Sequence, residues 1–214
     1  MKGITIKSCL SAGAACFALT LGGCISLPNG PMSPNPRFYL LSATSGPPVI
    51  KKINITPGVF IGIGPVKIPE YLNRPQMVTN DKAGTLKFDE FDRWGESLDI
   101  GIARLIREDL TAMLPEAKLA VYPWNPSVTV RYQVAVEIVQ LDSELDKGIF
   151  LAVQWMIIDL KNSKTVMIKR SEFRRPISPQ DYAGLAQTLS AACASLSGQI
   201  AEALSSPSVI PRYN

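Results

Sequence analysis

The stretch that most constrains the fold is residues 129–174, which has the pattern of three strands joined by short turns. Residues 129–141 (TVRYQVAVEIVQL) alternate apolar and polar side chains, the period of a strand with one buried face. Two more apolar segments, residues 149–160 and 165–174, follow after short polar turns. Strands connected by such short turns pair antiparallel. We therefore expect an antiparallel meander at the centre of the domain.

Two long helices are expected to flank these strands. Residues 97–114 repeat apolar side chains every three or four positions and stop at a proline, with Ser97 as the N-cap. A longer apolar stripe runs to residue 204, and the pattern predicts a helix with Ser178 as N-cap and Pro179 in the first helical position. Together these elements predict an α+β domain, an antiparallel β-sheet with two long helices packed on one face.

Shorter strands are expected before the first helix. Residues 37–42 and 59–67 are apolar and β-branched, and the glycines of the second segment permit close backbone approach. Residues 77–80 and 85–89 flank a turn sequence and predict a hairpin. Residues 90–96 (EFDRWGE) have the composition of a loop.

The N-terminus has the pattern of a lipoprotein signal peptide. An uncharged apolar run of about 13 residues follows Lys2 and Lys7, which is too short for the ~20 residues of a membrane-spanning helix. The run ends in Leu-Gly-Gly-Cys, with Cys24 last. We expect cleavage before Cys24 and lipidation of its thiol, so that a membrane anchor precedes the domain. An ordinary secretory signal cut at the same bond is the alternative.

The predicted organisation has four parts: a signal peptide over residues 1–23, a lipidated cysteine and linker over 24–36, the domain over 37–204, and a tail over 205–214. Residues 25–36 hold four prolines and no charge, so they predict an extended linker with a reach of up to ~40 Å. Removal of the signal takes away two lysines and leaves 20 basic and 18 acidic residues. This balance, without any basic cluster, predicts no nucleic-acid partner.

The residue types for catalysis are largely missing. The sequence contains no histidine, which removes the commonest general base and most zinc sites. The acids Asp89, Glu90, Asp92 and Glu96 form a cluster that could serve glycoside chemistry or bind a divalent cation, but such a run is more often a solvated loop. Cys193 lies on the apolar stripe of the last helix and is expected to be a buried, inert thiol. We predict no enzyme activity, no cofactor and no metal.

Two short segments are candidates for a partner interface. Arg93 and Trp94 stand on a polar stretch, and Arg74, Pro75 and Gln76 place a charged side chain and a rigid kink beside a strand. Trp and Arg often anchor protein interfaces. The alternative is that Trp94 folds back on the helix start and that Arg74 pairs with a local acid.

The chain resembles the PqiC family of ABC-type transport auxiliary lipoproteins. The resemblance is carried by Cys24 and by these segments of the sequence: FYLL from residue 38, IGIGPV from 61, IPEYLNRPQ from 68, FDRWGESL from 91 and GIAR from 101. It implies a non-enzymatic lipoprotein on the inner leaflet of the outer membrane, facing the periplasm. The implied partner is an MCE-domain protein of PqiB type, part of a lipid conduit that supports envelope integrity.

Residue 25 fits this location, because it is an isoleucine. In enteric bacteria, an aspartate at this position retains lipoproteins in the inner membrane. Two other roles stay open, a lipid-binding carrier with a cavity of its own and an assembly lipoprotein for another outer-membrane complex. A homo-oligomeric ring is attractive on symmetry grounds, although no residue requires it.

Overall fold

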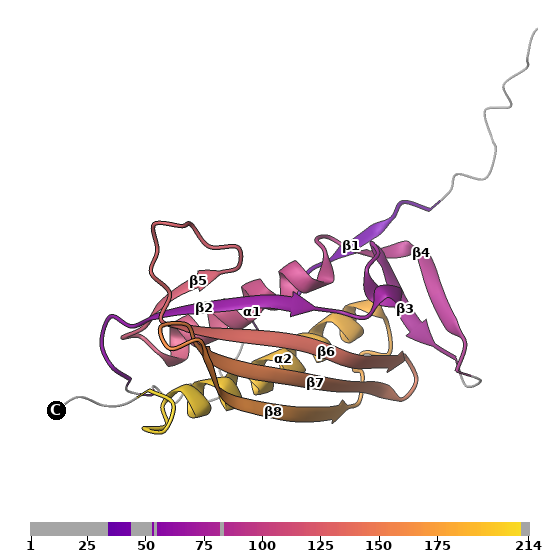
Figure 1. Ribbon diagram of the computed structural model, residues 1–214. Coiled ribbons are helices and arrows are strands. Elements are labelled where there is room, and N and C mark those ends of the chain that lie inside the picture. Colours follow the sequence, from indigo (N-terminus) through magenta and orange to yellow (C-terminus); the bar gives the residue numbers. More distant parts are fainter. Residues whose placement is uncertain (1–33, 44–52, 54, 82–83, 211–214) are drawn as a thin grey trace, which may run out of the picture. The chain divides into compact units, whose positions relative to one another are not determined.

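The predicted meander is present in the computed structural model as strands β6 (Tyr132–Glu144), β7 (Gly148–Asp159) and β8 (Lys164–Arg175), which pair antiparallel (Figure 1). The structure describes residues 34–43, 53, 55–81 and 84–210. Inward-facing residues of β6 and β7, such as Val134, Trp155 and Ile157, are completely buried. The alternation in the sequence therefore marks the face that lies on the core.

The large sheet is mixed, whereas an antiparallel sheet was expected. Strand β2 (Phe60–Lys67) pairs parallel with β6 on one side and with β5 (Lys118–Val121) on the other, in the order β5-β2-β6-β7-β8. Parallel neighbours need a crossover connection, and helix α1 (Leu98–Met113) lies between β2 and its two partners in the sequence. The α+β class is confirmed, with part of the sheet built by this crossover.

A second, three-stranded sheet contains the elements before α1. Its order is β1-β4-β3, with β1 (Arg37–Tyr39) parallel and β3 (Gln76–Asn80) antiparallel to β4 (Leu86–Trp94). The loop expected over residues 90–96 is wrong, because β4 continues to Trp94. Its last three residues pair with β1, more than fifty positions earlier in the chain, and a local pattern does not reveal such a partner.

Helices α1 and α2 (Tyr182–Leu204) both pack against the large sheet and against each other, and Figure 1 shows them behind its strands. The α2 helix begins later than the pattern predicts. Its N-cap is Asp181, whose carboxylate accepts a hydrogen bond from the amide of Gly184 at 2.7 Å. The predicted cap at Ser178 and the first helical position at Pro179 are therefore wrong, because the helix begins only at Tyr182.

Polar side chains tie the layers together from the core out to the surface of α2. The indole of Trp155 on β7 donates to Ser171 on β8 at 3.0 Å, and the Ser171 hydroxyl donates to Gln199 on α2 at 2.5 Å. In the same layer, Ser197 of α2 donates to Asp109 of α1 at 2.9 Å. Strands and helices are thus joined by a chain of satisfied hydrogen bonds as well as by apolar packing.

Cys193 is buried on α2, as the sequence predicts. Burial, with a smaller contribution from the charge of Asp109, raises the pKa of its thiol to about 12. The thiolate that would react is therefore strongly disfavoured.

Beyond the C-terminal end of α2, Val209 and Ile210 pack into the core, although they fall in the predicted tail.

The glycines of β2 allow the close approach that the sequence suggested. The ring of Trp124 lies over Gly62, and a Cβ atom added there would come within 2.5 Å of it. Gly64 has φ of +107°, a conformation that side chains with a Cβ rarely adopt. Both positions therefore need glycine for reasons of local geometry.

Replacing Ser171 with alanine should lower the free energy of unfolding by about 1–3 kcal/mol, because the buried Trp155 N–H loses its acceptor. Urea denaturation measures the change. Thr165→Ala, at an exposed position of the same strand, is the control and should change stability by less than about 0.5 kcal/mol. Equal effects of the two substitutions would show that the hydrogen bonds of Ser171 contribute nothing to the free energy of unfolding.

Candidate partner interface

The small sheet brings the two predicted interface segments together. Gln76 on β3 lies opposite Arg93 on β4, and the amide of Trp94 donates to the carbonyl of Pro75 at 2.7 Å. Pro75 is exposed, and Gln76 and Arg93 are half-buried. Residues almost twenty positions apart in the sequence thus form one continuous surface at the start of β3.

Arg74 adds a cation and an aromatic ring to this surface. Its guanidinium carbon lies 4.1 Å from the centroid of the Phe88 ring, within the range of a cation–π contact. Its Nε is buried and has no acceptor among the described residues. Arg74 therefore contacts an aromatic ring, and not a local acid as in one of the two expectations.

Arg93 is held by its own strand. Its Nε donates to the carbonyl of Glu90 at 2.9 Å, and its Nη2 lies 3.7 Å from the Glu90 carboxylate. Both groups remain partly in water, so the ion pair itself stabilises little. It fixes the direction in which the guanidinium points.

Trp94 faces inward. It is 8% exposed and belongs to the main hydrophobic core, together with Leu98 at the start of α1. This burial agrees with the alternative in which the indole folds back on the helix start. Trp94 can position the surface formed by Pro75, Gln76 and Arg93, but it offers little area of its own to a partner.

Behind the surface, β1 and β4 are joined by a buried carboxylate. Asp92 is 2% exposed, and its two oxygens accept hydrogen bonds from Arg37 and Tyr39, each at 2.7 Å. A buried carboxylate needs such partners to offset the loss of water. The acid that looked like part of a solvated loop is therefore the link between two strands.

Asp89 shapes an irregularity in β4. Between Gln76 and Val78 the partner in β4 moves from Arg93 to Phe88, so extra residues bulge out of the ladder. The Asp89 carboxylate accepts the amides of Phe91 and Asp92, each at 2.9 Å, and the hydroxyl of Tyr182 at 3.1 Å. It thereby closes the bulge and connects it to the first residue of α2.

These hydrogen bonds shift the pKa values of Asp89 and Tyr182. Burial alone would raise the pKa of Asp89, but the amides of Asp92 and Phe91 and the Tyr182 hydroxyl outweigh it, so its pKa lies below the ordinary value. Burial, together with the Asp89 charge, raises the pKa of Tyr182 to about 12. At neutral pH the pair is therefore a carboxylate accepting from a neutral phenol.

The acidic cluster thus has structural partners. Glu96 pairs with Arg104 of α1 at 2.5 Å, and the same arginine donates to the carbonyl of Leu41 at 2.6 Å. No set of three metal-ligating side chains comes together in the part of the chain that the structure describes. Sequence reasoning missed the roles of Arg37, Tyr39 and Tyr182, because no local signal shows that they meet Asp89 and Asp92.

Cys24 lies outside the described residues, and its lipidation stays a prediction. Within the ranges given above, no helix combines the length and the apolar character needed to cross a bilayer.

Comparisons with known proteins agree with this architecture. A family model described as the ABC-type transport auxiliary lipoprotein component matches residues 39–201. The fold is similar to an uncharacterised protein of known crystal structure (TM-score 0.65, 14% identity, covering 80% of this chain and 99% of that one). It is also similar to protein XCC0632 from Xanthomonas campestris (TM-score 0.59, 10% identity, covering 77% and 92%). A search of curated proteins gives no match.

Replacing Asp89 with asparagine should destabilise the domain by about 1 kcal/mol at pH 7, since hydrogen bonds to a charged acceptor are lost. The lowered pKa in the folded state means that the contribution of Asp89 is complete above its unfolded-state pKa. It is lost as the pH falls through the folded-state value. The stability difference between wild type and variant should therefore shrink below about pH 4.

Thermal unfolding from pH 7 to pH 3 measures this difference. Asp81→Asn at the β3–β4 turn is the control for removing an acid from the same sheet. A difference that stays constant down to pH 3 would contradict the role given to the Asp89 charge.

Proposed function

This protein belongs to the family of ABC-type transport auxiliary lipoprotein components, and we propose that it is the docking component of an intermembrane lipid-transport system. In this proposal Cys24 anchors it in the inner leaflet of the outer membrane, facing the periplasm. The domain receives an MCE-domain protein of PqiB type and performs no reaction itself. The family is one of transport auxiliaries and not a known family of enzymes.

The observation that carries the proposal is the surface at the start of β3. Arg74 over Phe88, exposed Pro75 and the Gln76–Arg93 pair form a patch of cation, aromatic ring and rigid backbone. Arginine and aromatic side chains are enriched in protein interfaces. The backbone beneath them is fixed by the Asp92 and Asp89 hydrogen bonds, which reduces the ordering that a partner would have to impose.

The packing gives less support to a lipid carrier. The space between the large sheet and the two helices holds Trp155, Leu105, Leu110 and Leu189, each at most 1% exposed. A phospholipid between the layers would have to displace these side chains at a cost of several kcal/mol. A docking role needs no such rearrangement.

Arg74→Ala should weaken co-purification with the MCE protein encoded in the same organism about tenfold, as expected for loss of an interface arginine. The matched control is Arg174→Ala. Arg174 also lies over an aromatic ring, 4.2 Å from the centroid of Phe150, but on β8. Pull-downs in mild detergent with both proteins expressed give the measurement. Wild-type protein that retains no MCE partner would refute the function, and equal losses in both variants would refute this surface.

Cys24→Ser should release the protein from the membrane fraction, because it removes the thiol that carries the lipid. Fractionation on a sucrose gradient should place the wild type with the outer membrane. Cys193→Ser is the control, since that thiol is buried. Wild type that sediments with the inner membrane would contradict the location, and a Cys24→Ser variant that stays in the membrane would contradict the anchor.

A further inference from the structure

Large apolar side chains are exposed mainly at one end of the domain. Among the described residues eight large hydrophobic side chains are exposed, and five belong to β1, β4 or the segments just beside them. They are Phe38, Leu40, Phe88, Phe91 and Ile100. Isolated exposed apolar residues are common in proteins, whereas a concentration at one place marks a contact surface.

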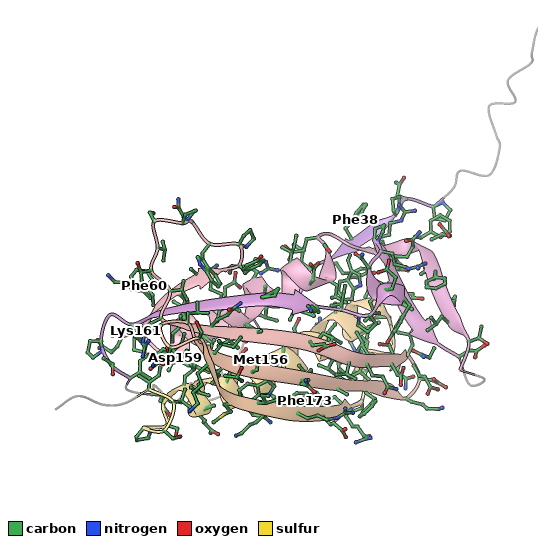
Figure 2. All side chains as sticks on the ribbon, in the orientation of Figure 1. Phe38, Phe60, Met156, Asp159, Lys161 and Phe173 are labelled. Atoms are coloured by element: carbon green, nitrogen blue, oxygen red, sulfur yellow. The ribbon has the colours of Figure 1, made fainter. Side chains whose placement is uncertain are left out.

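Phe38 and Leu40 point to the same side of the chain. Arg37 and Tyr39 both direct their side chains to Asp92, so the residues between and after them face the other way. The burial pattern agrees, because Leu41 is 2% exposed while Phe38 is 63% and Leu40 56% exposed. Figure 2 shows Phe38 at the opposite end of the domain from Phe60 and Lys161.

Ile100 extends this side onto helix α1. Arg104 reaches the carbonyl of Leu41, and Ile100 lies one turn before Arg104 on the same helix face. Ile100 is 57% exposed. We call Phe38, Leu40 and Ile100 the apolar patch.

Three cations beside the patch are paired with acids, while the acid next to Ile100, Asp99, accepts a hydrogen bond from the Ser97 hydroxyl. Arg37 pairs with Asp92, Arg93 with Glu90, and Arg104 with Glu96. The patch therefore offers apolar area without a field of one sign. This suits the region between lipid headgroups and acyl chains better than a strongly charged partner.

The position of the patch in the chain indicates its occupant. Cys24 precedes Phe38 by only fourteen positions, so a lipid on that cysteine keeps the patch within ~50 Å of the bilayer surface. A short tether also raises the effective concentration of the second contact into the millimolar range. Three side chains then suffice for a contact that would be weak between free partners.

We propose that Phe38, Leu40 and Ile100 insert into the interfacial region of the phospholipid bilayer that carries the anchor. The patch is a second membrane contact that orients the domain, with the β1 edge of the small sheet toward the lipid and next to Arg93 of the partner surface. This inference rests on the proposed anchor at Cys24. It adds an orientation that the anchor alone does not give.

The test uses the full-length lipidated protein in phosphatidylcholine vesicles. Phe38→Cys is labelled with the environment-sensitive fluorophore NBD, and buried Cys193 does not compete for the label. Ile168→Cys is the matched control, because Ile168 is 62% exposed on β8. A phospholipid with a nitroxide near the start of its acyl chain quenches only a fluorophore that reaches the interfacial region.

We expect NBD at position 38 to be quenched about twofold or more above NBD at 168, as for a side chain placed 5–10 Å into the interface. Quenching should not change in about 1 M NaCl, where the Debye length is only ~3 Å. Adding Leu40→Ser and Ile100→Ser while keeping the label at 38 should reduce quenching to the level of the 168 control. Equal quenching with and without these substitutions would show that the label is quenched only because the tether holds it near the bilayer. That result would overturn the proposal.

Three other outcomes also overturn it. The NBD label at position 38 could be shielded from aqueous iodide but not quenched by the lipid nitroxide. This result would assign the patch to a contact with a second copy of the chain. Vesicles that float without the protein would refute the anchor, and with it both the proposed function and this inference. Flotation with an unquenched label at 38 would overturn the inference alone.

Discussion

The carboxylate of Asp92 is buried, and both of its side-chain partners come from β1. A charge in that position is tolerated only while Arg37 and Tyr39 are in place. Its own backbone amide is held by Asp89, which also receives the hydroxyl of Tyr182 from the start of α2. One short network therefore fixes the first strand, the bulge in β4 and the end of a helix. The surface at Pro75, Gln76 and Arg93 is built on that frame.

The two surfaces lie side by side on the small sheet, because Arg93 of β4 pairs with Gln76 of β3 on one side and with Phe38 of β1 on the other. The order β1-β4-β3 places the apolar patch on the β1 side and the Arg74–Gln76 segment at the start of β3. A bilayer and a protein partner can thus be engaged by one rigid unit. The ~40 Å reach of the linker then becomes an upper limit to the distance between domain and membrane. The patch favours the lower end of that range.

Local patterns predicted the elements that bury one face over many residues. The meander and both helices carry several periods of apolar side chains, so their existence and most of their bounds follow from residues 97–114 and 129–204 alone. The parallel pairing of β2 could not be predicted in this way, because a fully buried strand has no period that distinguishes its neighbours. Residues 85–89 were expected as a strand and only the rest of β4 as a loop, because Glu90 and Asp92 add to the acids of this stretch and acids are poor strand formers in isolation. Only Arg37, Tyr39 and Tyr182, distant in sequence, make those acids favourable there. In the candidate interface Arg74, Pro75, Gln76 and Arg93 meet, while Trp94 faces the core. Their binding of a partner stays a prediction.

The parallel pairing of the three-residue strand β1 has a mechanical consequence. A domain held at its N-terminus receives every pull on the tether at Arg37, the first residue of that strand. The load passes in turn to the Arg37–Asp92 pair, the Tyr39 contacts with Asp92 and Gly95, and the Arg104 bond to Leu41. These contacts would bear the load one after another between the N-terminus of the domain and its core. Under tension β1 would separate from β4 before either helix or the large sheet unfolds. The contacts of Asp92 would therefore set the force at which a protein anchored at its N-terminus ruptures.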